Sequence, residues 1–245
     1  MQTVTSGSIS NRFLHRVVRF LFVGMVLATV FSACRTGAAT GGNNPGRLAT
    51  NAPTSVSCGH IQPEANLTGC NLQNRDLRSD SLHGAILTNA DARNVEARGV
   101  DLSGVVATNA DFTGADLPTA NLSNATSRGT NFSGANLRGV NLSSANLSNA
   151  ILGGANLRDA NLAGAVLSGA NLFSANLNSA QLNAADLTGA NLSGVDLTNA
   201  NLSGATIQGA VFSSATFANT TCPDGSNSDS DAGACDGHMS SASPK

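Results

Sequence analysis

Residues 190–204 read Ala-Asn-Leu-Ser-Gly, Val-Asp-Leu-Thr-Asn and Ala-Asn-Leu-Ser-Gly, and this five-residue pattern continues in one phase from Ala65 to Asn219. The stretch of 155 residues makes 31 pentapeptides without an insertion or deletion. The central position of the repeat is Leu in 22 copies, Phe in four and Ile in one. Two residues before the centre stands Ala in 22 copies and Val in five. Both positions are therefore expected to face a core.

The position two residues after the centre carries Gly in 15 repeats and Asn in eight, the residue types that adopt a positive φ most readily. We expect a corner of the chain there in every repeat. A period of five excludes an amphipathic helix, because at about 100° per residue successive leucines drift around the helix axis. It excludes a long strand as well, since side chains of a strand alternate with period two. Very short strands joined by corners and wound into stacked coils satisfy the pattern.

Three repeats carry a resemblance to a known family: Ala-Asn-Leu-Ser-Gly at 190–194 and 200–204, and Ala-Asn-Leu-Arg-Gly at 135–139. They resemble the repeats of pentapeptide-repeat proteins, and the resemblance covers about two thirds of the chain. It implies an all-β fold, a right-handed quadrilateral parallel β-helix with four pentapeptides in each coil. The 31 repeats would then form a solenoid of about eight coils.

The first 33 residues are typical of an export signal. Arginines precede an apolar run from Phe20 to Phe31, which is too short for a permanent membrane-spanning helix. Small residues then precede Cys34, and they resemble the processing site of bacterial lipoproteins. This resemblance implies that Cys34 receives the lipid, with ordinary secretion and a retained anchor as alternatives. Arg35 follows the cysteine, and its resemblance to lipoprotein signals that lack an inner-membrane retention aspartate implies the outer membrane or the cell surface rather than the inner membrane.

Residues 34–57 consist mostly of small and polar residues and predict a flexible tether. The repeat domain, with a disulfide cap at its N-terminal end, is expected over 58–221. A disulfide-closed cap and a disordered tail are expected over 222–245.

Four further cysteines flank the repeats in two local pairs, Cys58 with Cys70 and Cys222 with Cys235. In an exported protein two local disulfides are the natural pairing. Each disulfide would close a loop across an open end of the core, where solenoids are weakest. Four free thiols, or one metal site made of all four cysteines, are the alternatives. The metal site is disfavoured because the two pairs lie at opposite ends and neither has CxxC spacing.

Charged outward positions form one column when the repeats are aligned every twenty residues. Two of its arginines have acidic residues two positions away, so Arg138 and Arg158 are expected to project the less compensated charge. Exposed ion pairs of this kind contribute little to stability. The column is therefore a candidate interaction surface.

A second candidate surface stacks Thr88 and Thr108 with other Thr, Ser and Val residues. Such a ladder could contact a protein or ice, although β-branched residues are also what exposed strand positions prefer. Phe173 points outward in the same alignment and marks a further contact patch.

Three tail residues, Asn227, Asp229 and Asp231, alternate as the ligands of a calcium loop do. Ala232 stands where such a loop needs Gly, and no Glu closes it. A polar loop held by its disulfide is favoured, so we expect no metal site and no cofactor.

The repeats carry ten acidic residues and seven arginines, so no basic stripe exists for nucleic acid. No nucleophile, base and orienting acid recur at spacings that would gather them, and no small-molecule substrate is expected. The sequence predicts a non-enzymatic structural or protein-interaction module of the bacterial cell envelope, with an unidentified protein partner and a lipid in the membrane. A surface adhesin or an ice-binding ladder is the alternative. The resemblance also implies a gyrase-protecting DNA mimic, which ranks third because it needs a cytoplasmic location and a densely acidic surface.

Overall fold

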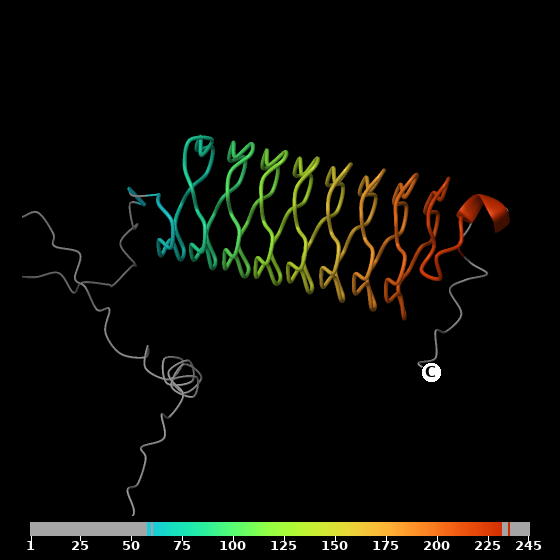
Figure 1. Ribbon diagram of the computed structural model, residues 1–245. Coiled ribbons are helices and arrows are strands. Elements are labelled where there is room, and N and C mark those ends of the chain that lie inside the picture. The colour runs from blue at the N-terminus through green and yellow to red at the C-terminus, as the bar shows by residue number, and fades with distance from the viewer. Residues whose placement is uncertain (1–57, 60, 232–234, 236–245) are drawn as a thin grey trace, which may run out of the picture. The chain divides into compact units, whose positions relative to one another are not determined.

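The computed structural model describes residues 58–59, 61–231 and 235. These residues form one stack of coils that runs from the cyan end to the red end of the ribbon in Figure 1. The expected export signal, the lipid site expected at Cys34, the expected tether and most of the C-terminal tail lie outside the described residues.

Parallel bridges join residues twenty positions apart, from Asn66 with Ile86 to Asn201 with Thr221. Twenty residues hold four pentapeptides, so paired residues lie one coil apart. The short strands of the expected fold are reduced to isolated bridges at the residue before each centre, and no longer strand forms among the described residues. Two N–H groups of most repeats donate to the next coil, as from Leu142 to the carbonyl of Asn161 at 2.7 Å.

The corner predicted two residues after each centre is confirmed. The φ angle there is positive throughout the repeats, as at Gly104 (66°) and Asn109 (56°), with Ser79 as the exception. A hydrogen bond from the N–H of the next repeat to the central carbonyl closes each turn, as from Ala145 to Leu142 at 3.1 Å. A positive φ at the third residue is what such a turn requires.

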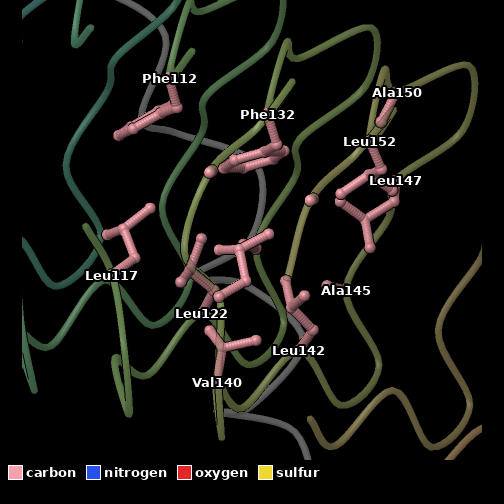
Figure 2. Close-up of a cluster of buried hydrophobic side chains, with 14 of the residues drawn as sticks. Phe112, Leu117, Leu122, Phe132, Val140, Leu142, Ala145, Leu147, Ala150 and Leu152 are labelled. Carbon is pink, nitrogen blue, oxygen red and sulfur yellow. The ribbon is translucent and has the colours of Figure 1, made fainter. Parts of the chain in front are cut away.

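The core consists of the two positions that were predicted to face inward. All 22 central leucines are buried, and so are most of the small residues two positions earlier. Figure 2 shows these side chains gathered inside the coils, with Phe112 and Phe132 above a group of leucines. The departures lie at the two ends of the stack. In the first coil Arg75 and Asp80 occupy the small position and are only half-buried, and in the last coil the core side chains from Ile207 onward are half-buried as well.

Small residues at four central positions are compensated by larger neighbours. Phe112 follows Ala107 and Phe132 follows Ser127, each by one repeat, and the two rings stack with centroids 5.3 Å apart (Figure 2). Near Ala92 and Ala97 the position two residues before the centre carries valine instead of the usual alanine, at Val95, Val100 and Val105. The total side-chain volume of each coil is thereby kept close to what the core can hold.

A disulfide covers the N-terminal end of the core. Cys58 and Cys70 are bonded at 1.94 Å, and both are buried. Arg75 donates a hydrogen bond from its guanidinium to the carbonyl of Cys58 at 2.8 Å. The charged side chain that departs from the repeat pattern therefore helps to hold the cap in place.

The C-terminal cap begins where the repeats end. Thr221 forms an antiparallel bridge with Asn227, and the short 3-10 helix η1 (Ser228–Asp231) follows. Cys222 is bonded to Cys235 at 2.01 Å. Thr220 is buried and donates from its hydroxyl to the carbonyl of Leu197 at 2.8 Å. The described part of the chain contains no helix long and apolar enough to span a membrane.

Candidate interaction surface

Outward side chains stand directly before and after the centre of each repeat. The residue before the centre is most often Asn or Asp, and its side-chain oxygen accepts a hydrogen bond from the N–H of the residue after the centre. In one such pair Ala163 donates to Asn161 Oδ1 at 3.1 Å. This N–H takes no part in the bonding between coils, so the side chain satisfies a group that would otherwise need water.

Several of these side chains also bond to one another from coil to coil. Asn161 donates to Asn141 at 3.3 Å, Asn141 to Asn121 at 3.2 Å, and Asn121 to Asp101 at 3.2 Å. The sequence analysis missed this asparagine ladder, although an Asn at the same place in every fourth repeat could have indicated it. The ladder amides are engaged in the fold and are not open binding groups.

Ion pairs gather on the N-terminal coils. Arg78 Nη2 lies 2.7 Å from Asp76 Oδ2 and 3.3 Å from Glu96 Oε2, and Arg93 Nη2 lies 2.7 Å from Asp91 Oδ2. The hydrogen bond from the Arg78 side chain lowers the pKa of Asp76 to about 2. The hydrogen bond from the Arg93 side chain likewise lowers the pKa of Asp91 to about 2. The acidic groups of these coils are thus partly neutralised by neighbours.

The expectation that Arg138 and Arg158 project less compensated charge left out one acidic neighbour, which the two arginines share. The Nε atoms of both arginines lie near Asp159 Oδ2, at 3.4 Å and 3.6 Å. Asp159 occupies a corner with φ of 60°. Corner residues do not belong to the column of charged residues that was aligned from the sequence. The three groups are exposed and form a small solvated ion-pair cluster, in which two arginines share one carboxylate and positive charge remains in excess.

The face of Thr88 and Thr108 is not a uniform ladder. Both threonines are half-buried, and Ile86 beside them is 38% exposed. Two coils beyond Thr88 the exposed Arg128 interrupts the column, and the next member, Ser148, is buried. The regular part of this face therefore spans only a few coils.

The tail residues proposed as weak calcium ligands take part in the cap. Asn227 donates from its side chain to Asn219 Oδ1 at 3.0 Å, and the N–H of Asn219 donates to Asp229 Oδ1 at 2.7 Å. Asp231 is the last residue of η1. The described residues contain no group of three or more His, Cys, Asp and Glu side chains that could hold a metal ion.

One Ser, one His and one Asp come together on the N-terminal coils, although the sequence analysis found no spacing that would gather a nucleophile, a base and an orienting acid. His83 Nδ1 lies 2.8 Å from Ser103 Oγ, and the same hydroxyl donates to Asp101 Oδ1 at 2.6 Å. Because its proton is directed at the carboxylate, the Ser103 hydroxyl is not arranged to lose that proton to the histidine. The trio lacks the order that nucleophilic catalysis requires.

The most exposed apolar side chains lie on one face. Phe173 is 54% exposed, Val211 46% and Ile151 41%. Bridges connect Ile151 to Asn171 and onward to Val211, coil by coil, and Phe173 lies two residues after Asn171. No charged residue stands before or after the centre on this face between Asn131 and Ser213. This combination of exposed apolar groups with missing charge makes the Phe173 face, residues 131–213 of these two columns, the strongest candidate for contact with a protein.

The family model of pentapeptide repeats matches the chain in eight copies. The matched residues are 65–104, 85–124, 119–154, 141–178, 150–189 and 180–219. Together they include all the pentapeptides counted from the sequence. A comparison with curated proteins gives no significant match.

Solved structures of three proteins are similar to the chain. HetL, a pentapeptide-repeat protein involved in heterocyst differentiation regulation from the cyanobacterium Nostoc sp. strain PCC 7120, is 31% identical over 68% of this chain and 89% of its own, with a TM-score of 0.33. Rfr23, a pentapeptide-repeat protein from the cyanobacterium Cyanothece 51142, is 26% identical over 62% of this chain and 84% of its own, with a TM-score of 0.27. QnrB1, a plasmid-mediated fluoroquinolone resistance protein, is 18% identical over 65% of this chain and 87% of its own, with a TM-score of 0.38.

Proposed function

Since the chain belongs to the pentapeptide-repeat family, we propose that it is a non-enzymatic structural or protein-interaction module of the bacterial cell envelope. The observation that carries this proposal is the pair of disulfides, one at each end of the repeats. Disulfides form and persist in oxidising compartments, and they are rare in the cytosol. An export signal over residues 1–33 would deliver the chain to such a compartment.

The lipid on Cys34 would hold the module at a membrane, and residues 34–57 would serve as the tether. The outer membrane or the cell surface is the favoured location, and secretion is the alternative. In this arrangement the repeats would stand away from the membrane and present their faces to neighbouring molecules.

The repeat domain would act as a stiff spacer, a right-handed, four-sided β-helix of about eight coils. The bridges between residues twenty apart support four repeats in each coil. Most outward polar groups are used within the fold, as in the asparagine ladder. Recognition would therefore rely on the side chains left exposed, above all those of the Phe173 face.

Membrane fractionation and lipid labelling of cells that express the chain test this function. We expect the unaltered chain to incorporate a labelled fatty acid and to sediment with membranes. Cys34→Ser abolishes both, whereas the matched control Thr36→Ser, two residues further on, changes neither. An unlabelled chain found in the cytoplasm would contradict the proposal and would favour the DNA-mimic alternative.

The face of Thr88 and Thr108 supports a second candidate function, an adhesin or an ice-binding ladder. The exposed Ile86 beside these threonines favours it, because a flat face of β-branched side chains is what such contacts use. A thermal-hysteresis assay and a cell-adhesion assay would separate this function from a passive spacer. Thr88→Lys should abolish either activity, while Thr198→Lys on another face should leave it unchanged.

A further inference from the structure

Two unusual residues follow one another in a column of the Phe173 face. Phe173 and Gly153 stand directly after the centre in adjacent coils, and Gly153 has no side chain to fill its place. The exposed Ile151 stands two residues before Gly153. The other members of the column are polar, namely Gln73, Arg93, Thr113, Ser133, Ser193 and Ser213. The large exposed ring of Phe173 thus lies one coil away from Gly153, a position without a side chain.

This arrangement is self-complementary under a two-fold axis. An axis that lies across the stack, midway between the coils of Gly153 and Phe173, sets Phe173 of one copy against Gly153 of the other. The reverse contact forms at the same time, because a two-fold interface uses the same patch twice. The same axis sets Ser133 against Ser193. Identical coil spacing in the two copies keeps the remaining positions in register.

The charge pattern of the face permits identical surfaces to meet. The face is uncharged from Asn131 to Ser213, so no like charges would be brought together at its centre. The nearest charged members of its columns, Asp111 and Arg93, lie toward the N-terminal end and would fall at the rim. The centres of protein–protein interfaces are depleted in charged residues and enriched in aromatic residues, and the Phe173 face has both properties.

We propose that the Phe173 face binds a second copy of this chain in antiparallel orientation, with Phe173 placed over Gly153 of the other copy. The inference names the partner for the interaction role proposed above and rests on that role, but it does not depend on a lipid at Cys34. One face of a narrow coil buries less area than a standard interface. The dimer is therefore expected to be weak, with a Kd on the order of micromolar.

Sedimentation equilibrium of the full chain with Cys34→Ser and intact disulfides measures the dimer. Phe173→Ser introduces the residue type that the column carries elsewhere, and it should weaken association about tenfold or more. Gly153→Arg should have an equal effect because it fills the place that receives the ring. Gln208→Arg, which adds the same charge directly after the centre on another face, should leave association unchanged.

Cysteine cross-linking in the same Cys34→Ser background tests the orientation. A mixture of Ser133→Cys chains with Ser193→Cys chains should form a disulfide-linked dimer, and neither variant should do so alone. Ser143→Cys with Ser203→Cys, the same separation along the stack on a different face, is the matched control and should not cross-link. A chain that stays monomeric at all concentrations, or that cross-links equally in every mixture, overturns the proposal. Such a result for a chain that is acylated at Cys34 would leave the envelope function intact.

Discussion

At the corner of almost every repeat the backbone adopts a positive φ, a conformation that is unfavourable for any residue with a side chain. A left-handed conformation costs an L-residue roughly 1–2 kcal/mol, and glycine escapes that cost. Ala184 and Thr119 nevertheless have φ angles of 57°, because the repeat demands a corner there whatever residue is present. The bonds between coils and the buried leucines override the local preference at these positions.

Ala184→Gly should therefore stabilise the protein. Relief of the left-handed strain exceeds the entropy that glycine loses on folding, and we expect a net gain of about 0.5–1 kcal/mol in the free energy of unfolding. The opposite change, Gly134→Ala, should cost about 1–2 kcal/mol, because φ is 62° there and no atom lies within 4 Å of the added Cβ. Urea unfolding followed by circular dichroism measures both changes.

Gly114→Ala provides the matched comparison at a crowded corner. An added Cβ on Gly114 would lie 2.5 Å from Asn94 Oδ1, so this side chain must move in addition to the backbone strain. The variant should be less stable than Gly134→Ala. Equal losses at the two glycines would mean that the asparagine side chain yields without cost, and a loss of stability in Ala184→Gly would contradict the account of the corners.

At the scale of the repeat, the residue before the centre holds the outer surface together. Asn161 accepts a hydrogen bond from the N–H of Ala163 and donates one to Asn141, so it ties its own turn and the coil before it. Asn, rather than another polar residue, suits this position because one amide can accept locally and donate to the neighbouring coil. The fold itself thus accounts for the Asn of the Ala-Asn-Leu pattern.

Asn161→Ala should lower the free energy of unfolding by about 1–2 kcal/mol, because it removes both hydrogen bonds. Asn161→Asp should cost less, since its carboxylate still accepts from Ala163 and only the donor to Asn141 is lost. Unfolding curves of the two variants and the unaltered chain test this order. The reverse order, with Asp the more harmful, would show that repulsion along the ladder outweighs the turn bond.

The ion pairs of the first coils predict a stability change in acid. The pKa of Asp76 and that of Asp91 are lowered from 3.8 to about 2 in the folded chain by Arg78 and Arg93. A carboxyl group whose folded pKa is lowered binds protons more weakly in the folded state, so its contribution is complete above about pH 4 and is lost as the pH falls to about 2. The effect should be modest, because these side chains are exposed.

Urea unfolding between pH 2 and 5 measures the acid response. Arg78→Gln should reduce the loss of stability in this window, because it removes the side-chain hydrogen bond that contributes most to lowering the pKa of Asp76. Arg158→Gln is the control, since its partner Asp159 is shared with Arg138. An unchanged acid response in Arg78→Gln would show that the ion pair does not form in solution.

The inward positions and the corners could be predicted from the sequence because each recurs every five residues. The compensation of Ala107 by Phe112 could not, since it depends on which side chains meet across the core. The same holds for Arg138 and Arg158, whose shared partner Asp159 lies at a corner of the chain. The asparagine ladder could have been predicted in part. Its residues recur every twenty positions, and this period is visible in the sequence once the number of repeats in each coil is known.

At the scale of the whole molecule, the caps matter because each coil is held only by its neighbours. Half-buried Ile207, Phe212 and Phe217 in the last coil show how much of the core an end leaves incompletely covered. The two disulfides span 12 and 13 residues, and loops of this length contribute about 3 kcal/mol on the chain-entropy model. Both ends are thereby protected from fraying.

Replacement of Cys222 and Cys235 together by Ser should loosen the C-terminal end first. We expect amide hydrogens at Thr220 and Ser228 to exchange faster, because their mutual hydrogen bonds join the closed loop to the end of the last repeat. Amides of the central coils, such as that of Leu147, should keep their protection. Equal loss of protection along the whole stack would contradict a role confined to the end.

We propose above that this repeat protein is exported and carries a disulfide at each end, and the intact mass of the chain from the organism that makes it tests both features at once. Masses are measured after alkylation, with and without prior reduction. We expect a lipid-bearing species that begins at Cys34 and gains four alkyl groups only after reduction. An unprocessed chain that is alkylated without reduction would contradict both the export and the disulfide caps.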